Sequence, residues 1–309
     1  MNKSLFGSLK DKISRKPSTR ANTSADNQRQ PRSTTRQPFT MGNPFSEKHN
    51  REGEQPPPPY SPIMDRAKIT NDADEYAFLS TFDTIILIDD SGSMEGSRWL
   101  EVKQVLKAIT PICTEHDEDG IDVYFLNNRS ESPDQPKNKA RGGYYNIKSA
   151  DEVQWLFESV QPRYLTPTGR RLRDILKPYC KQLESSNDMD NVKPVNIIVI
   201  TDGQASDDPE SIIVENARTL DTLGAPLYQV GIQFFQVGDD PDARVALKEL
   251  DDGLAHNGIR DMVDTVSWDA NAPSNEMALS AEKILKIVLG GVLRRIDRQT
   301  PGVDGRRRT

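Results

Sequence analysis

Residues 84–93 read Thr-Ile-Ile-Leu-Ile-Asp-Asp-Ser-Gly-Ser. The first five form a short apolar run rich in isoleucine, which is typical of a strand buried on both faces of a parallel sheet. Asp89, Ser91 and Ser93 follow at alternating positions, so one carboxylate and two hydroxyls are expected at the carboxyl end of that strand. Ligands of open α/β sheets bind at this edge, and Mg²⁺ prefers oxygen donors. The stretch therefore predicts a metal site.

Two distant segments have the composition that would complete this site. Residues 193–200 form a second apolar strand, and Asp202 follows its end, with Gly203 allowing a tight turn. Between the two strands, the turn-like cluster at residues 165–169 offers the hydroxyl of Thr166 from a third loop. Asp89, Ser91, Ser93, Thr166 and Asp202 are thus five candidate oxygen donors.

These three segments, Asp-x-Ser-x-Ser, Thr-Pro-Thr-Gly and Thr-Asp-Gly, together resemble a von Willebrand factor type A (VWA) domain over residues 80–297. The resemblance implies a metal-ion-dependent adhesion site (MIDAS). In it, Ser91, Ser93 and Thr166 would bind Mg²⁺, or alternatively Mn²⁺, directly or nearly so, while Asp89 and Asp202 would act directly or through water. It also implies one open coordination position, which an acidic side chain of a protein partner fills. No site position departs from the family pattern.

Simpler and competing interpretations of the same residues exist. Taken singly, Thr166 is also a common helix N-cap residue and Asp202 a common turn residue. A calcium loop starting at Asp89 would need Gly and Glu where Met94 and Leu100 stand. A phosphotransferase of the haloacid dehalogenase type would need a second acid in place of Ser91. A serine hydrolase elbow is absent from the sequence.

From residue 80 onward, strand and helix patterns alternate, which predicts right-handed βαβ units. Six strands are expected near residues 83–89, 121–126, 144–147, 193–200, 227–235 and 262–266, the third being a short edge strand. The acids at residues 207–210 are expected to cap the helix that begins there. The predicted fold class is α/β: a Rossmann-like, doubly wound, mostly parallel six-stranded sheet with helices on both faces.

Composition divides the chain into three regions. Residues 1–75 are polar and lack a sustained apolar pattern, which predicts a disordered basic, Pro-rich tail. Residues 80–297 are the expected VWA domain, and residues 298–309 a flexible basic tail. Residues 1–60 hold 11 Lys or Arg against 5 Asp or Glu, whereas the remainder holds 29 against 42. The acidic domain argues against nucleic-acid binding, and a solvated arm is preferred over membrane contact for the basic tail.

The N-terminal tail also carries a short recognition motif. Residues 55–60 read Gln-Pro-Pro-Pro-Pro-Tyr, and prolines favour the extended polyproline II helix that aromatic-lined grooves recognise. Pro57, Pro58 and Tyr60 match the PPxY ligand of WW domains, which include those of HECT-type ubiquitin ligases. A stiff linker is the simpler interpretation.

Compartment and function are expected as follows. Cys113 and Cys180 lie in predicted helices of a domain large enough to need no disulfides, and the sequence contains no signal peptide or transmembrane segment, which predicts a cytoplasmic protein. The leading hypothesis is a non-enzymatic, metal-dependent adaptor that binds an acidic residue of a protein ligand and recruits a WW-domain protein. Alternatives are a Mg²⁺-dependent phosphate-processing enzyme and a structural VWA domain without a ligand.

Overall fold

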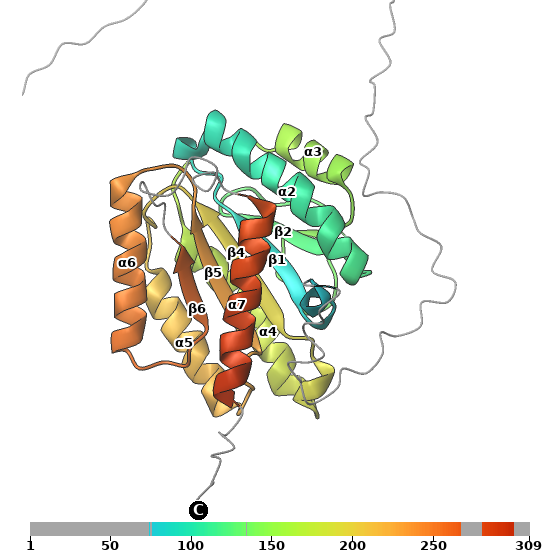
Figure 1. The fold of residues 1–309 in the computed structure, drawn as a ribbon, viewed down its shortest axis with the longest axis vertical. Helices are drawn as coiled ribbons and strands as arrows, with labels where there is room; N and C mark the ends of the chain where they lie inside the picture. The colour runs from blue at the N-terminus through green and yellow to red at the C-terminus, as the bar shows by residue number, and fades with distance from the viewer. Residues whose placement is uncertain (1–73, 75, 134, 267–279, 300–309) are drawn as a thin grey trace, which may run out of the picture. The chain divides into compact units, whose positions relative to one another are not determined.

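The structure is a computed structural model that describes residues 74, 76–133, 135–266 and 280–299. It contains one six-stranded sheet with the order β3-β2-β1-β4-β5-β6 (Figure 1). The strands are β1 (Asp83–Ile88), β2 (Ile121–Phe125), β3 (Tyr144–Ile147), β4 (Val195–Thr201), β5 (Val230–Gln236) and β6 (Val263–Val266). Only β3 runs antiparallel to its neighbour, so the predicted six-stranded, mostly parallel sheet is confirmed.

Helices cover both faces of this sheet. They are α2 (Ser97–His116), α3 (Ala150–Ser159), α4 (Thr168–Ser185), α5 (Pro209–Thr222), α6 (Pro241–His256) and α7 (Ala281–Gln299). Short 3-10 turns occur at Ala77–Thr81 (η2), Gly92–Met94 (η3) and Met189–Asn191 (η4). In Figure 1, α2 and α7 cross the near face of the sheet, and α3 packs against α2.

The core has one layer on each side of the sheet because alternate strand residues point to opposite faces. Leu87 of β1 belongs to the cluster that α4, α5 and α6 cover, together with Val199, Phe234, Leu172, Ile213 and Leu247. On the other face, Trp99 of α2 packs against Phe157 of α3 with ring centroids 4.5 Å apart and against Phe125 at 5.9 Å. Both faces of β1 and β4 are thereby buried, as their apolar sequences predicted.

Local signals explain where several helices begin. Ser149 caps α3 through a capping box with Glu152, which donates its backbone N–H to the serine and accepts from the backbone N–H of Ser149. Asp208 caps α5 by accepting from the backbone N–H of Ser211 at 3.0 Å. Asp207 instead accepts from the backbone N–H groups of Gly169 and Arg170 at the start of α4. Asp208 therefore caps the helix that follows it, as predicted, whereas Asp207 serves the neighbouring helix α4.

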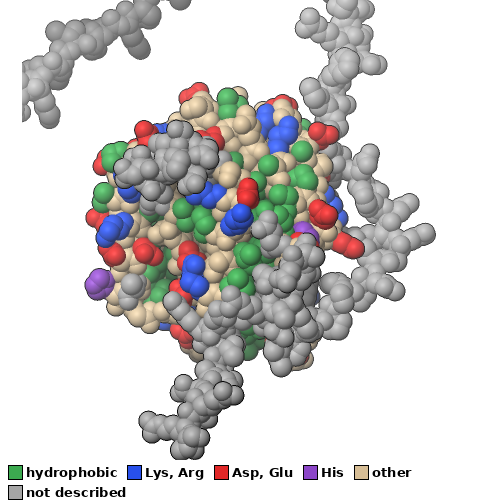
Figure 2. All heavy atoms as spheres, viewed as in Figure 1, with side chains coloured by type: hydrophobic (Ala, Val, Ile, Leu, Met, Phe, Trp, Pro, Cys, Tyr) green, Lys and Arg blue, Asp and Glu red, His purple; other side chains and the backbone are tan. Residues whose placement is uncertain are grey.

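Several sequence predictions lie outside the described residues. They are the disorder of the N-terminal tail, the PPxY motif at Pro57, Pro58 and Tyr60, and the flexibility of the C-terminal tail beyond residue 299. Among the helices that the structure describes, none is both long and apolar enough to cross a membrane. On the face that Figure 2 shows, Lys and Arg side chains are interspersed with Asp and Glu and do not gather into a basic patch.

Candidate metal centre

The two candidate carboxylates lie at the carboxyl ends of adjacent parallel strands. β1 and β4 pair in register up to Ile88 and Ile200, and the backbone N–H of Asp89 continues the ladder by donating to Ile200 at 2.9 Å. Asp89 directly follows β1 and Asp202 directly follows β4. Their relative exposures are 0% and 1%, so both carboxylates are removed from water at this edge of the sheet.

The carboxylate of Asp89 is held in a fixed orientation. One oxygen, Oδ1, accepts from the backbone N–H of Ser91 at 2.9 Å, and Oδ2 accepts from the hydroxyl of Thr201 at 2.6 Å. Burial nevertheless raises the pKa of Asp89 from its ordinary value of 3.8 to about 6, and these hydrogen bonds offset only part of that effect. A buried carboxylate of this kind is more favourable when a cation balances its charge.

Two serine hydroxyls connect to the second carboxylate. The Oγ atoms of Ser91 and Ser93 are 3.0 Å apart, and Ser93 Oγ donates to Asp202 Oδ1 at 2.8 Å. Asp202 and Ser93 are more than 100 residues apart in the chain, so this contact is a product of the fold. The structure therefore brings together Ser91, Ser93 and Asp202 by direct contact, with Asp89 bonded to the backbone of Ser91.

Thr166 comes from the loop that precedes α4, and this loop lies against both other segments. The backbone N–H of Gly92 donates to Tyr164 O at 3.3 Å, and that of Ser206 donates to Thr166 O at 2.9 Å. Thr166 is buried, with 8% of its surface exposed. Among the described residues, no hydrogen bond joins its hydroxyl to the other four side chains. The loop is placed as predicted, while the role of the Thr166 side chain stays a prediction.

Asp90, to which the sequence assigned no role, holds together the segments that carry the candidate ligands. Its Oδ1 accepts from the backbone N–H of Asn127 at 2.7 Å, and its Oδ2 accepts from that of Asn128 at 2.8 Å. The Asn127 amide in turn donates to Leu165 O at 2.8 Å. Asp90 thus ties the end of β1 to the end of β2 and to the Thr166 loop.

Arg98 is a second residue whose role the sequence did not reveal. Its Nη1 donates to Asp202 Oδ2 at 2.7 Å and to the backbone carbonyl of Ser93 at 3.2 Å. Its side chain is 29% exposed, and it comes from the first turn of α2, which follows the Asp89 segment. Arg98 therefore holds one oxygen of Asp202 while the other oxygen faces Ser93.

A different acidic cluster lies at the opposite end of β1. Carboxylate oxygens of Asp83, Asp117 and Asp119 lie within 4.8 Å of one another, a separation that a metal ion can bridge. The ammonium of Lys193 already occupies the centre of this cluster, at 3.2 Å from Asp83, 2.8 Å from Asp117 and 3.7 Å from Asp119. Although burial favours a neutral amine, the neighbouring carboxylates outweigh it and raise the pKa of Lys193. This cluster is an internal ion pair network rather than part of the MIDAS pattern.

The donor set at the first site fits a hard divalent cation. It consists of two buried carboxylates and two hydroxyls that converge at one edge of the sheet, and all are oxygen donors. The two described histidines have other partners. His116 Nδ1 lies 3.4 Å from Asp74 Oδ2, and His256 Nδ1 contacts the backbone carbonyl of Asp252, so neither is bonded to Asp89 or Asp202. Cys113 and Cys180 are both buried and form no disulfide.

A search of curated proteins gave no match. The solved structures that resemble the chain include proximal thread matrix protein 1 of the mussel byssus (17% identity, TM-score 0.38, 68% of this chain and 48% of that chain). They also include the PilB minor pilin of Streptococcus sanguinis (13%, 0.36, 71% and 63%) and the manganese-loaded TRAP protein of Plasmodium vivax (13%, 0.37, 69% and 74%). The chain thus spans less than two thirds of the length of the first two of these proteins.

The model of the von Willebrand factor type A domain matches residues 83–263. Since that match covers more than half of the sequence, the chain belongs to the von Willebrand factor type A domain family.

Proposed function

We propose that the chain is a metal-dependent protein-binding adaptor whose VWA domain, residues 80–297, captures an acidic side chain of a partner. The observation that carries this proposal is the contact of Ser91, Ser93 and Asp202 beside the buried Asp89. Asp89, Ser91, Ser93, Thr166 and Asp202 would hold Mg²⁺, with Mn²⁺ as the alternative ion. The metal supplies the positive charge that attracts the carboxylate of the partner.

The charge of the surrounding residues supports an anionic ligand. Two carboxylates, Asp89 and Asp202, balance a divalent cation, and Arg98 adds one further positive charge at hydrogen-bonding distance from Asp202. A loaded site would therefore carry a net positive charge, and a carboxylate entering a partly dry site is attracted more strongly than it would be in water. The same positive charge would repel a Lys or Arg side chain from the metal.

The first experiment tests metal binding. Thermal unfolding of the full chain is followed during titration with Mg²⁺ and with Mn²⁺, and the Tm is expected to rise by mass action. The rise should disappear in Asp89→Ala and persist in the control Asp151→Ala, which removes an exposed aspartate from the first turn of α3. An equal rise in Asp89→Ala would refute the site. A phosphatase assay with metal is expected to be silent, and activity there would instead favour the enzymatic alternative.

The second experiment tests partner capture. Affinity capture with the full chain is performed in Mg²⁺ and in chelator, and partners are expected to be recovered only with metal. If chelation lowers the Tm but leaves recovery unchanged, the metal has a purely structural role.

We also propose that the N-terminal tail couples this module to a WW-domain protein such as a HECT-type ubiquitin ligase. The support is the sequence of residues 57–60, Pro-Pro-Pro-Tyr. Isolated WW domains should bind the full chain and should lose binding in Tyr60→Ala, and unchanged binding would refute this part alone. The two free, buried cysteines support the cytoplasm as the proposed compartment.

A further inference from the structure

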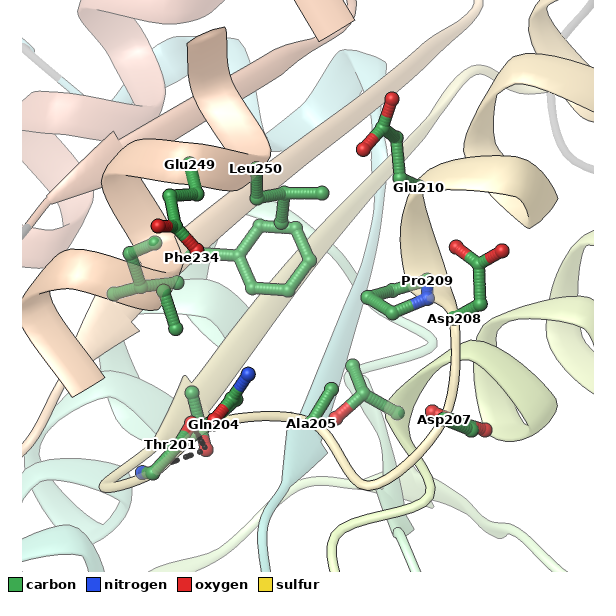
Figure 3. Close-up of a pocket in the computed structure, with 14 residues that line it drawn as sticks. Thr201, Gln204, Ala205, Asp207, Asp208, Pro209, Glu210, Phe234, Glu249 and Leu250 are labelled. Atoms are coloured by element: carbon green, nitrogen blue, oxygen red, sulfur yellow. Dashed lines mark hydrogen bonds between the residues drawn. The ribbon is translucent and has the colours of Figure 1, made fainter. Parts of the chain in front are cut away.

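A cavity of about 320 Å³ lies next to the candidate metal centre, between the segment that leads into α5 and the helix α6 (Figure 3). In Figure 3, Phe234, Glu249 and Leu250 lie on one side of the cavity, and Pro209 and Glu210 on the other.

The cavity and the metal centre share one segment of chain. Thr201 and Gly203 line the cavity, and Asp202 lies between them in the sequence. The hydroxyl of Thr201 also donates to Asp89 at 2.6 Å. The cavity and the metal centre are therefore neighbours at the carboxyl end of β4.

The inner wall of the cavity is apolar. Phe234, Leu247 and Leu250 contribute to it, and their exposures are only 2%, 5% and 9%. Pro209 and Ala246 extend this surface on the two sides of the cavity. Such a wall suits the hydrocarbon part of a side chain.

The mouth of the cavity is acidic. Asp207, Asp208, Glu210 and Glu249 all line it, whereas none of the lining residues is Lys, Arg or His. Asp207, Asp208 and Glu210 already accept hydrogen bonds, from the start of α4, from the backbone N–H of Ser211 and from Asn257 respectively. Glu249 is exposed and makes no hydrogen bond or ion pair with another described residue. An apolar wall beside the exposed carboxylate of Glu249, with no basic residue in the lining, matches a long side chain that ends in a positive charge.

We propose that this cavity binds an arginine or lysine side chain of the protein partner, so that the partner is recognised by a basic residue close to its metal-binding acidic residue. The pairing of the two residues depends on the proposed metal-dependent function, whereas the cavity itself does not require metal. The hydrocarbon stem packs against Phe234 and Leu250, and the charged group lies near Glu249.

The cavity is tested first with a small cation. Binding of 4-fluorophenylguanidine to the full chain is measured by ¹⁹F NMR, with the uncharged 4-fluorophenylurea as its analogue. The cation is expected to bind, and Glu249→Gln should weaken it about twofold to fivefold, as removal of one partly exposed charge does. Glu184→Gln, an exposed glutamate of α4 outside the cavity, should have no effect. Ala246→Met, which fills the space, should abolish binding.

This test separates the cavity from the metal centre. The probe should bind equally to Asp89→Ala, which lacks the proposed metal ligand. Equal binding of the guanidine and the urea, or no effect of Glu249→Gln, overturns the cavity proposal and leaves the metal proposal standing. If the probe binds but Mg²⁺ does not raise the Tm, the cavity proposal stands and the metal proposal is refuted.

The pairing is tested with synthetic peptides that contain one Glu and one Arg separated by increasing numbers of glycines. Control peptides carry citrulline, the uncharged analogue of arginine, in place of Arg. In Mg²⁺, the arginine peptide of at least one spacing is expected to bind more tightly than its citrulline control. Glu249→Gln should remove this difference in affinity. Equal binding of the arginine and citrulline peptides at every spacing, or no binding of either series, overturns the paired recognition.

Discussion

Replacing Asp89 with Asn should stabilise the metal-free protein at neutral pH. Asp89 is fully buried, and burial raises its pKa from 3.8 to about 6. The folded state therefore holds the proton of Asp89 more tightly than the unfolded state does. The stability that Asp89 contributes is lost as the pH rises from about 4 to 6, and its contribution is constant above pH 6. At about 1.4 kcal/mol per pH unit, the two-unit shift corresponds to a cost of about 3 kcal/mol at pH 7.5.

Asparagine removes this cost without changing the shape of the side chain. Its carbonyl oxygen keeps the hydrogen bond from the backbone N–H of Ser91, and its amide can donate to the Thr201 hydroxyl, which now serves as acceptor. In chelator at pH 7.5, Asp89→Asn is therefore expected to be more stable than the original chain by up to about 3 kcal/mol, or roughly 6–12 °C in Tm for a domain of this size. At pH 4 the two proteins should be equally stable.

The assay is urea denaturation at pH 4 and pH 7.5, in chelator and in saturating Mg²⁺. Mg²⁺ at a hundred times its Kd should stabilise the original chain by about 2.7 kcal/mol and the variant not at all. The difference between the two proteins isolates Asp89 from the other buried acids, whose contributions are common to both. The reasoning is refuted if the variant is less stable in chelator at pH 7.5, or if the difference is the same at both pH values.

Three further substitutions test other parts of the structure. Arg98→Gln removes the cation 2.7 Å from Asp202 and should tighten Mn²⁺ binding about threefold to tenfold in titration calorimetry; weaker binding would contradict competition between Arg98 and the metal. Tyr164→Gly should stabilise the protein by about 1 kcal/mol in urea denaturation, because Tyr164 is 69% exposed and adopts φ +73, and a loss of stability would show that its side chain is needed. Lys193→Met should cost about 3 kcal/mol in the same assay because it leaves the buried Asp117 without its cation, and an unchanged midpoint would refute that role.

The sequence predicted the fold and the adjacency of the two strand ends that carry Asp89 and Asp202, because both depend on local patterns. The isoleucine-rich runs that became β1 and β4 are buried on both faces, and their short length and β-branched residues favoured a strand over a buried helix. Once these strands are adjacent and parallel, residues that directly follow them must meet at one edge. That is why Asp89 and Asp202, more than 100 residues apart in the sequence, could be expected to lie close together.

The contacts of Arg98 and Asp90 were not predicted, because no sequence pattern shows which distant segment each residue meets. Arg98 looks like an ordinary surface charge in the first turn of an amphipathic helix, and only the fold places it against Asp202. Asp90 reads as part of a turn, although its two oxygens hold the ends of two strands together. The cavity next to the site combines the segment before α5 with α6, so neither segment alone reveals it.

The choice of serine at positions 91 and 93 affects what a loaded site would attract. Both side chains are neutral oxygen donors, so Asp89 and Asp202 supply the only two negative charges among the donors that contact one another. Two carboxylates balance a divalent ion, and Arg98 then adds one positive charge in contact with these donors. If either serine were an aspartate, a third negative charge would cancel this excess and the loaded site would no longer favour an anion. Neutral donors would therefore hold a metal ion while preserving its attraction for a carboxylate, and this is the physical reason that the arrangement suits the proposed recognition of an acidic residue.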